Sequence, residues 1–196
     1  MKNLHGLLLA AGKSERLGRP KQLIDYQGKP LVRHISEVAL AAQLDSLTIV
    51  TGAHSEKVNA ALKGLSVQIR DNEDWARGMG SSIAAGAKSI LAKHPDATGI
   101  LILLSDQPNI TSEHLLNLQN VFERKGAYLA VSAYKDTFGV PALVGRNFFD
   151  DLLKLEGDQG AKQIFIKEVI PDMQVAFPDA ALDIDTPEDL AKFESS

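Results

Sequence analysis

Basic side chains gather in one short segment that follows an apolar run near the N-terminus. Lys13, Arg16, Arg19 and Lys21 come directly after the small residues of Leu9-Ala10-Ala11-Gly12. Small residues after a strand let the backbone approach a ligand closely, and N–H groups in such a turn can bind phosphate oxygens. Such a cluster can neutralise a triphosphate, and a solvated basic turn is an equal alternative for this loop taken alone.

Two common phosphate-binding loops do not fit this segment. A Walker loop that ends in Gly12-Lys13-Ser14 would need glycine at position 7, where the chain has Leu7. The dinucleotide pattern GxGxxG would need glycines closer together than Gly12 and Gly18. If this segment binds phosphates, it does so as another type of loop.

Carboxylates follow two further extended segments. Asp106 ends the most apolar run of the chain, where a carboxylate without a partner is costly, and Mg2+ is a hard cation that prefers oxygen ligands. Asp183 and Asp185 lie two residues apart, so both face one side of an extended piece. We expect Asp106 and Asp185 to bind the metal, because Asp185 lies where the chain meets a helix capped by Thr186. The alternatives are a turn at Asp106 and two acids that only complement a helix dipole.

A hydrolase-type motif offers a second interpretation. Gly80-Ser81-Ser82-Ile83-Ala84 approximates GxSxG, with alanine in the last place, and would make Ser82 a nucleophile. A nucleophilic serine needs a general base, and nothing in the sequence ties His94 or His114 to Ser82. The five histidines show no metal-ligand spacing, and we expect surface or capping positions for all of them: His5, His34, His54, His94 and His114.

Alternating apolar runs and helical patterns provide the scaffold for these residues. Short, wholly apolar strands between helices are typical of a parallel sheet covered on both faces. The fold class is therefore α/β, a three-layer Rossmann-like fold with a mostly parallel central sheet and helices on both faces. The expected strands are 4–10, 47–51, 67–70 and 99–104, and the expected helices are 30–42, 55–62 and 81–92.

The pattern is looser after residue 104. A helix over 111–122, capped by Thr111 or Ser112, is followed by strands at 127–133 and 140–144 and by helices at 147–155 and 159–168. Ligands of open α/β sheets bind at the carboxyl ends of the strands. The loops after residues 10, 70, 104 and 182 are therefore where we expect the chemistry.

The bulk composition limits the class of protein. A chain of 196 residues with 44% hydrophobic residues predicts one globular domain over 1–196. Its net charge of -4 argues against nucleic acid as a partner. It has no cysteine, and the apolar run near the N-terminus is too short to span a membrane. The run resembles a weak signal-peptide core, but Gly12, Lys13, Glu15 and Arg16 follow it at once, which favours a first buried strand. We therefore expect a cytoplasmic protein with no membrane partner.

The first loop resembles the signature LAAG-x-S-x-R-[ML]-G-x-x-K of MobA-like nucleotidyltransferases, closest to the molybdenum cofactor cytidylyltransferases. The matched positions are Leu9, Ala10, Ala11, Gly12, Ser14, Arg16, Leu17, Gly18 and Lys21. The resemblance covers about residues 4 to 192 and implies a nucleotide-diphospho-sugar transferase type of fold. It implies that Leu9, Ala10, Ala11, Gly12, Lys21 and Asp106 bind the nucleotide and that Arg16, Lys21 and Asp106 are catalytic.

Other segments are similar to the family in the same order. Segment 72–82 resembles N-x-x-[WY]-x-x-G-[ML]-x-x-S, which implies nucleotide contacts from Asn72, Gly78, Gly80 and Ser81. Asp106 begins an Asp-x-Pro segment, and 183–189 is similar to D-[IV]-D-T-P-x-D, which implies Mg2+ ligands. Segments 138–141 and 155–161 resemble the acceptor side, with Gly139, Pro141 and Asp158. Asp158 either orients the acceptor or caps a helix that starts at Gln159.

The resemblance implies Mg2+-dependent transfer of a nucleoside monophosphate to the phosphate of a molybdopterin-type cofactor, with release of pyrophosphate. Guanylyltransferase members usually carry LAGG, so Ala11 favours CTP over GTP as the donor. It also implies transient contact with the enzymes that receive the cofactor. Two alternatives stay open: another phosphorylated acceptor (a sugar phosphate, phosphocholine or phospholactate), and a non-catalytic nucleotide-binding protein. The presence of Lys21, Asp106 and Asp185 together weighs against the second.

Overall fold

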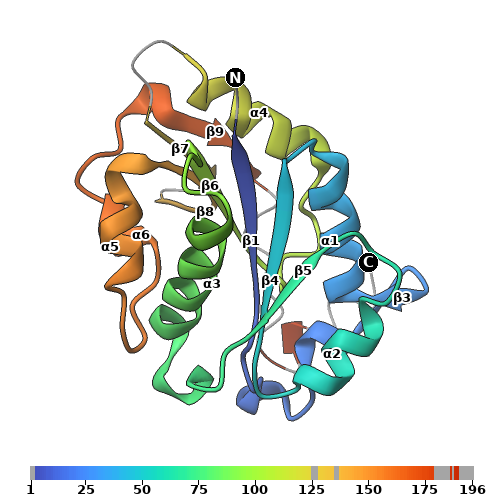
Figure 1. Ribbon diagram of the computed structural model, residues 1–196. Coiled ribbons are helices and arrows are strands. Elements are labelled where there is room, and N and C mark those ends of the chain that lie inside the picture. Colours follow the sequence, from blue (N-terminus) through green and yellow to red (C-terminus); the bar gives the residue numbers. More distant parts are fainter. Residues whose placement is uncertain (1–2, 125–127, 135–136, 179–185, 187, 190–196) are drawn as a thin grey trace.

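A seven-stranded sheet forms the middle layer of the computed structural model, which describes residues 3–124, 128–134, 137–178, 186 and 188–189 (Figure 1). The strand order is β5-β4-β1-β6-β8-β7-β9. The first four strands of this order are parallel, and β8 runs antiparallel to both β6 and β7. The strands are β1 (Leu4–Ala10), β4 (Ser46–Thr51), β5 (Gln68–Asp71), β6 (Gly99–Leu104), β7 (Leu129–Tyr134), β8 (Thr137–Gly145) and β9 (Gln174–Ala176).

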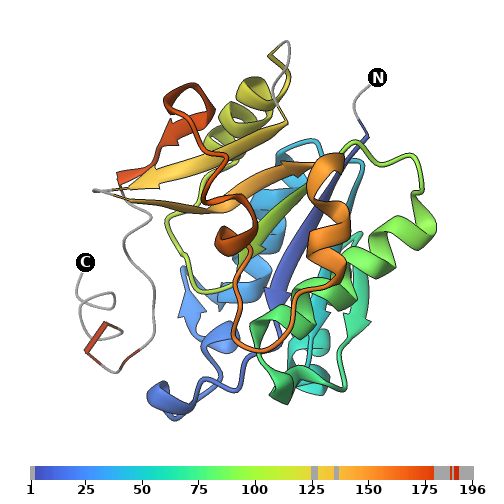
Figure 2. The same ribbon diagram turned by 90° about the vertical axis from the view of Figure 1, so that its left-hand side faces the viewer.

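Helices cover both faces of this sheet, which confirms the predicted three-layer α/β fold (Figure 1). One face carries α1 (Leu31–Ala41), α2 (Ser55–Ala61) and α4 (Ser112–Phe122). The other face carries α3 (Met79–Lys93), α5 (Phe149–Leu153) and α6 (Lys162–Phe165), which face the viewer in Figure 2. None of the helices in the described part of the chain is long and apolar enough to cross a membrane.

The central strand β1 shows why the apolar runs are continuous. Leu4 and Leu8 belong to the core cluster beneath α1, α2 and α4, whereas Leu7 and Leu9 belong to the cluster beneath α3, α5 and α6. Successive side chains of a strand point to opposite faces, so a strand that is covered on both faces favours apolar residues along its whole length, and His5 is the polar exception in β1. All seven residues of β1 are buried.

The structure differs from the expected elements mainly after β6 and in one early hairpin. β8 begins at Thr137 instead of residue 140, and α6 ends at Phe165 instead of residue 168. A hairpin of β2 (Asp25–Tyr26) and β3 (Lys29–Pro30) was not foreseen. Its turn places Gln27 (φ 54°) and Gly28 (φ 81°) in the left-handed region, where asparagine or aspartate before glycine is the usual signal.

Two histidines that were expected at the surface are buried, and that expectation was wrong. His114 of α4 stacks on Phe177 at 4.2 Å and donates from Nε2 to Ser132 Oγ at 2.7 Å. Burial lowers the pKa of His114 to about 4. His5 of β1 stacks on His94 at 4.1 Å, and both of its ring nitrogens lie within hydrogen-bond distance of neighbouring side chains. The sequence pattern did not show whether a single histidine within an apolar segment points into the core or to the surface.

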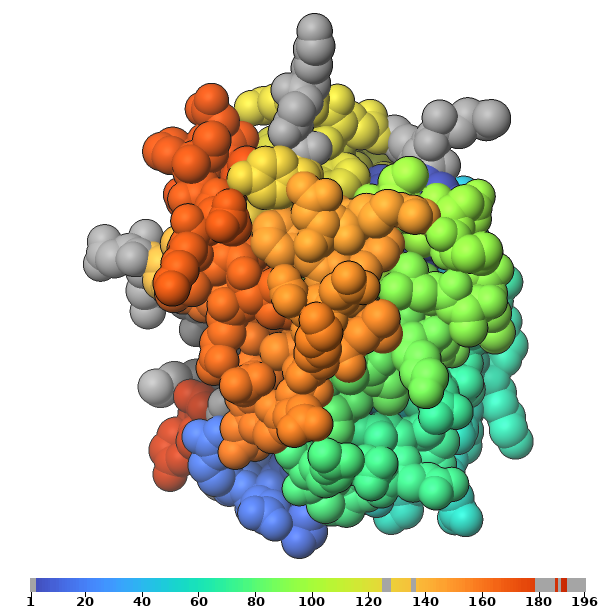
Figure 3. Space-filling view, turned by 60° about the vertical axis from the view of Figure 1, so that its left-hand side comes forward, coloured from blue at the N-terminus to red at the C-terminus, as the bar shows by residue number. Residues whose placement is uncertain are grey.

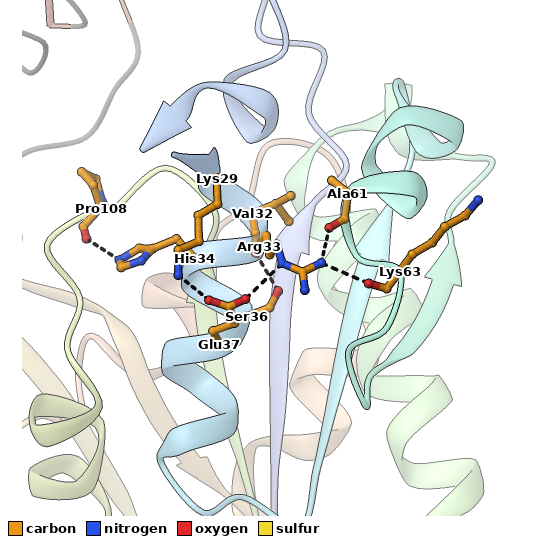
Figure 4. A network of polar contacts seen from close by, with 9 residues as sticks. All are labelled: Lys29, Val32, Arg33, His34, Ser36, Glu37, Ala61, Lys63 and Pro108. Carbon is orange, nitrogen blue, oxygen red and sulfur yellow. Dashed lines mark hydrogen bonds and ion pairs between the residues drawn. The ribbon is translucent and has the colours of Figure 1, made fainter. Parts of the chain in front are cut away.

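Polar contacts from α1 tie together the loops on its side of the sheet (Figure 4). Arg33 Nη1 donates to the carbonyls of Ala61 and Lys63 at 3.0 and 3.1 Å, where α2 ends. His34 Nε2 lies 3.3 Å from the carbonyl oxygen of Pro108, which can only accept. Through this bond α1 supports the loop after β6, which carries Asp106.

Candidate active site

A cleft of about 480 Å³ lies at the carboxyl ends of β1 and β6. Four parts of the chain line it: the loop after β1, the start of α3 with the turn before it, the loop after β6, and the segment between α5 and α6. Figure 3 shows the first of these loops (blue) meeting the chain before α3 (green) and the segment that contains α5 and α6 (orange) at one end of the molecule. The lining residues that matter below are Leu9, Ala11, Gly12, Lys13, Ser14, Arg16, Lys21, Gln22, Trp75, Gly78, Met79, Ser82, Ser105, Asp106 and Asp158.

The loop after β1 is closed on itself by bonds between its two ends. Ser14 has left-handed backbone angles (φ 60°, ψ 43°), and its Oγ accepts from the N–H of Lys21 at 3.1 Å. This bond brings the short helix at Lys21–Leu23 back beside the small residues after β1. Gln22, only 1% exposed, donates to the carbonyl of Gly12 at 2.8 Å. The ammonium of Lys21 is therefore placed in the cleft by a folded loop.

Lys21 and Asp106 form an ion pair across the cleft, between Nζ and Oδ2. Their side chains are 19% and 10% exposed. Removing one member of a largely buried pair leaves an uncompensated charge, which is strongly unfavourable. The pair joins two loops that are 85 residues apart in sequence, so the fold itself brings these two predicted site residues together.

The second carboxylate oxygen of Asp106 fits a metal ion. Oδ1 is buried and has no hydrogen-bond partner, which is costly for a charged group unless a cation takes that place. No group of three or more histidine or acidic residues that could hold a metal occurs in the part of the chain that is described. Mg2+ needs only one or two carboxylates when substrate phosphates complete its shell. The predicted second ligand, Asp185, lies outside the described residues, as does Asp183.

Two further cations of the first loop line the same cleft. Arg16 is exposed there. Lys13 donates to Glu15 Oε1 at 2.9 Å, and this hydrogen bond lowers the pKa of the Glu15 carboxyl. The loop thus brings several positive charges to one wall of the cleft, opposite the exposed Asp158.

Two glycines at the start of α3 are required by the packing of the chain against itself. Gly78 has φ +104°, and a Cβ there would lie 2.3 Å from the carbonyl oxygen of Gly157. A Cβ at Gly80 would lie 2.7 Å from the backbone of Glu156. These contacts press the segment around residue 157 against the start of α3. Gly78 also lines the cleft, whereas Gly80 does not.

Asn72 and Ser81 lie near the first turn of α3 but outside the cleft. Nδ2 of the buried Asn72 donates to Ser81 Oγ and Ser82 Oγ, each at 3.0 Å. Asn72 and Ser81 line a separate groove, while Ser82 lines the cleft. Ala10 lines neither of them, because it is the buried last residue of β1.

Ser82 is not placed as the nucleophile of a hydrolase. It lies inside α3 and not at a turn between a strand and a helix, and Asn72 donates to its hydroxyl. The histidines once considered as its base have other neighbours: His114 is bonded to Ser132, and His94 stacks on His5. The hydrolase interpretation is therefore abandoned.

The three residues expected on the acceptor side, Gly139, Pro141 and Asp158, lie in different places in the structure. Asp158 lines the cleft, and it does not cap a helix, because α6 begins at Lys162 with Ala161 as its N-cap. Gly139 lines a small pocket of about 120 Å³ that shares Leu9, Met79 and Leu104 with the cleft. Pro141 is buried within β8, and its carbonyl accepts from Ser132 Oγ at 2.7 Å.

Sequence reasoning gave no site role to several residues of the cleft wall, among them Gln22, Trp75 and Met79. Trp75 carried a signal, because it is the single tryptophan of the chain and lies inside a segment already under consideration. Gln22 carried none. A glutamine next to a basic loop has the composition of a solvated turn, and only the packing around it shows that it is buried.

Comparisons with known proteins identify relatives of this chain. The chain is 40% identical over 107 residues to "Nicotine blue oxidoreductase" of Paenarthrobacter nicotinovorans, which covers 54% of this chain and half of that protein. It is 31% identical over 168 residues to "Purine catabolism protein PucB" of Bacillus subtilis (strain 168), covering 82% of this chain and 80% of that protein.

Among solved structures, Rv0371c of Mycobacterium tuberculosis H37Rv superposes with a TM-score of 0.85 at 32% identity, covering 100% of this chain and 98% of that one. Its manganese complex superposes with a TM-score of 0.79 at 30% identity, over the full length of both chains. The model of the MobA-like NTP transferase domain matches residues 6–171. This protein belongs to the MobA-like NTP transferase family.

Proposed function

We propose that this nucleotidyltransferase moves CMP from CTP to the phosphate of a molybdopterin-type cofactor and releases pyrophosphate, with Mg2+ as its metal. The family establishes the nucleotidyltransferase class. The observation that carries the proposal is the meeting of Lys21 and Asp106 in one cleft. A cation for phosphates and a carboxylate for a metal lie side by side there, as transfer at a phosphorus atom requires.

The reaction needs no side-chain nucleophile. An oxygen of the acceptor phosphate forms a bond to the α-phosphorus of the nucleotide, and the bond from that phosphorus to the bridging oxygen of pyrophosphate breaks. The chain contributes position and charge, which are the main sources of rate in this chemistry. Lys21 and Arg16 bind the phosphates and offset the negative charge that develops on the leaving group.

Asp106 would hold the metal through its carboxylate, with Asp185 as the proposed second ligand. Bound Mg2+ would supply Lewis-acid stabilisation of the phosphate oxygens. The manganese complex of Rv0371c supports a divalent cation in proteins of this kind. We propose that Lys21 turns from Asp106 to a phosphate when substrate binds, so that the ion pair of the free protein is exchanged.

The choice of CTP rests on Ala11. This residue lines the cleft and is 6% exposed, so its methyl group occupies space in a tight part of the wall. One methyl group in a close-packed site discriminates between ligands by about 10–200-fold. We propose that it favours the smaller cytosine over guanine.

Pyrophosphate release from CTP and from GTP, each with Mg2+ and molybdopterin, tests this function. We expect release with CTP and formation of a cytidine dinucleotide. Release with a sugar phosphate but not with molybdopterin would assign the alternative acceptor. Binding of CTP without turnover on any of these acceptors would show a non-catalytic nucleotide-binding protein.

A further inference from the structure

Trp75, the single tryptophan of the chain, lies where the loops after β1, β4 and β5 meet. The sheet order β5-β4-β1 places the loop after β4 between the other two. The N–H of Ala53 joins this middle loop to the carbonyl of Ala11 at 3.1 Å, and the N–H of Asn72 donates to the carbonyl of Thr51 at 2.9 Å. The three loops therefore lie side by side at the carboxyl ends of their strands.

Gly52, in the middle loop, leaves the room that the indole of Trp75 needs. A Cβ on Gly52 would lie 2.7 Å from Cβ and 2.9 Å from Cγ of Trp75, and 2.9 Å from the carbonyl oxygen of Ala11. Contacts this short do not occur between real atoms of these kinds, so any side chain here would push the neighbouring loops apart. Without one, Trp75 and Ala11 become neighbours in the wall of the cleft.

The indole of Trp75 is fixed on one side and open on the other. It is half-buried and packs against the core cluster beneath α3, which includes Leu9, Ala11 and Val50. Trp75 also lines the cleft, and no other aromatic residue among those described does so. The cleft therefore has one flat, apolar part of its wall, held in place by the core behind it.

The strand order separates this part of the wall from the metal side. Asp106 follows β6, on one side of β1, whereas Trp75 follows β5, on the other side. A nucleotide whose phosphates meet Lys21 and Asp106 extends from there either toward β8 or toward Trp75. Gly139, which is expected on the acceptor side, belongs to β8, so the side of Trp75 is left for the base.

We propose that Trp75 is a specificity-determining residue whose indole lies against the nucleobase, and that Gly52 is the residue that positions it. The ligand class, a nucleoside triphosphate, rests on the proposed function. Aromatic side chains bind nucleobases by stacking, because every base has a flat π-face. Ala11 then limits the size of the base, while Trp75 supplies most of its contact area.

Titration of the full chain with two ligands tests the proposal. CTP carries a base and tripolyphosphate does not, and each is added with Mg2+ while binding is measured by calorimetry. Tryptophan emission is followed in parallel, and all of it comes from Trp75. In the wild type, CTP should quench this emission because the base stacks on the indole, whereas tripolyphosphate should bind without quenching.

Substitutions at the two residues separate contact from structure. Trp75→Leu should bind CTP about 10-fold more weakly, within the range for one base stacked on an aromatic ring, and should bind tripolyphosphate as the wild type does. Trp75→Phe keeps a ring and should retain most of the affinity for CTP. Gly52→Ala should weaken both CTP binding and the quenching, because the added Cβ displaces the indole.

Phe122→Leu is the matched control. Phe122 is the last residue of α4, is also a half-buried aromatic residue, and packs against the core cluster beneath α1, α2 and α4. It does not line the cleft. Its replacement removes a similar amount of packing and should change neither the affinity for CTP nor the quenching.

The outcomes distinguish two failures. If neither CTP nor GTP binds to the wild type in calorimetry, the proposed function is wrong. If CTP binds without any change in emission, or if Trp75→Leu loses as much affinity for tripolyphosphate as for CTP, only the role of Trp75 is overturned. The wild-type titration and Trp75→Phe decide the question should Trp75→Leu not fold.

Discussion

The ammonium of Lys21 lies against one carboxylate oxygen of Asp106, Oδ2, while the other oxygen, Oδ1, is buried without a hydrogen-bond partner. On the proposed function, Lys21 competes with a metal ion for the charge of Asp106, and Asp106 competes with a phosphate for the charge of Lys21. A metal at Asp106 releases Lys21 for a phosphate, and a phosphate at Lys21 releases Asp106 for a metal. Linkage then requires that metal and nucleotide strengthen each other's binding by the same factor.

Asp106→Asn tests the carboxylate directly. The amide keeps the shape of the side chain but removes the charge that a divalent cation needs. Turnover should fall by about two orders of magnitude or more, the range for losing one electrostatic stabiliser. Mn2+ binding, followed by electron paramagnetic resonance without nucleotide, should also be lost. Near-normal turnover at saturating Mg2+ would show that Asp106 does not hold the metal.

Lys21→Met tests the exchange of partners. Without the competing ammonium, the free protein should bind Mn2+ about 10-fold more tightly, while its affinity for CTP falls. Lys29→Met removes the same charge from an ion pair with Glu37 that lies away from the cleft, and should leave Mn2+ affinity unchanged (Figure 4). Tighter Mn2+ binding in both variants would indicate a diffuse effect of net charge.

Gly78→Ala should distort the wall of the cleft. The backbone angle of φ +104° strains any side chain, and the new Cβ would collide with the carbonyl of Gly157. We expect a loss of stability of about 1–3 kcal/mol, measured by urea unfolding, together with weaker CTP binding. Gly160→Ala, whose Cβ would lie an ordinary 3.7 Å from Met79 Sδ, is the control and should unfold like the wild type.

His114 should make stability depend on pH. Burial lowers its pKa from 6.5 to about 4, so between these values the unfolded chain binds a proton that the folded chain does not. Stability therefore declines as pH falls from 6.5 to 4, by at most roughly 3 kcal/mol, and this contribution levels off below that range. His114→Gln keeps a donor for Ser132 and should flatten the decline in urea unfolding. An unchanged slope would assign the pH dependence to other groups.

Base selection is tested at Ala11. The wild type should prefer CTP over GTP in kcat/KM, and Ala11→Gly should narrow the gap by admitting GTP, within the 10–200-fold that one methyl group can account for. Paired kinetics on both proteins with both nucleotides measure this. A wild-type preference for GTP, or a ratio that the substitution does not move, would show that Ala11 is not the selector.

Local patterns in the sequence were enough to predict the three-layer fold and the ends of β1, β4 and β6. Strands buried on both faces are nearly continuous apolar runs, and such runs can be recognised directly in the sequence. The carboxyl ends of these strands in turn pointed to the loops with Lys21 and Asp106. These inferences need no knowledge of which distant segments touch.

The tertiary structure decided which way individual side chains point and which distant residues they contact. Whether Ser81 or Ser82 faces the cleft depends on the rotation of α3. Pro141 is buried in β8, which lies between β6 and β7 in the sheet. Gly78 is needed because Gly157, far along the chain, presses on it. Gln22 looks like a surface residue until the loop folds over it. Such roles arise from the packing of segments distant in sequence, which no local pattern encodes.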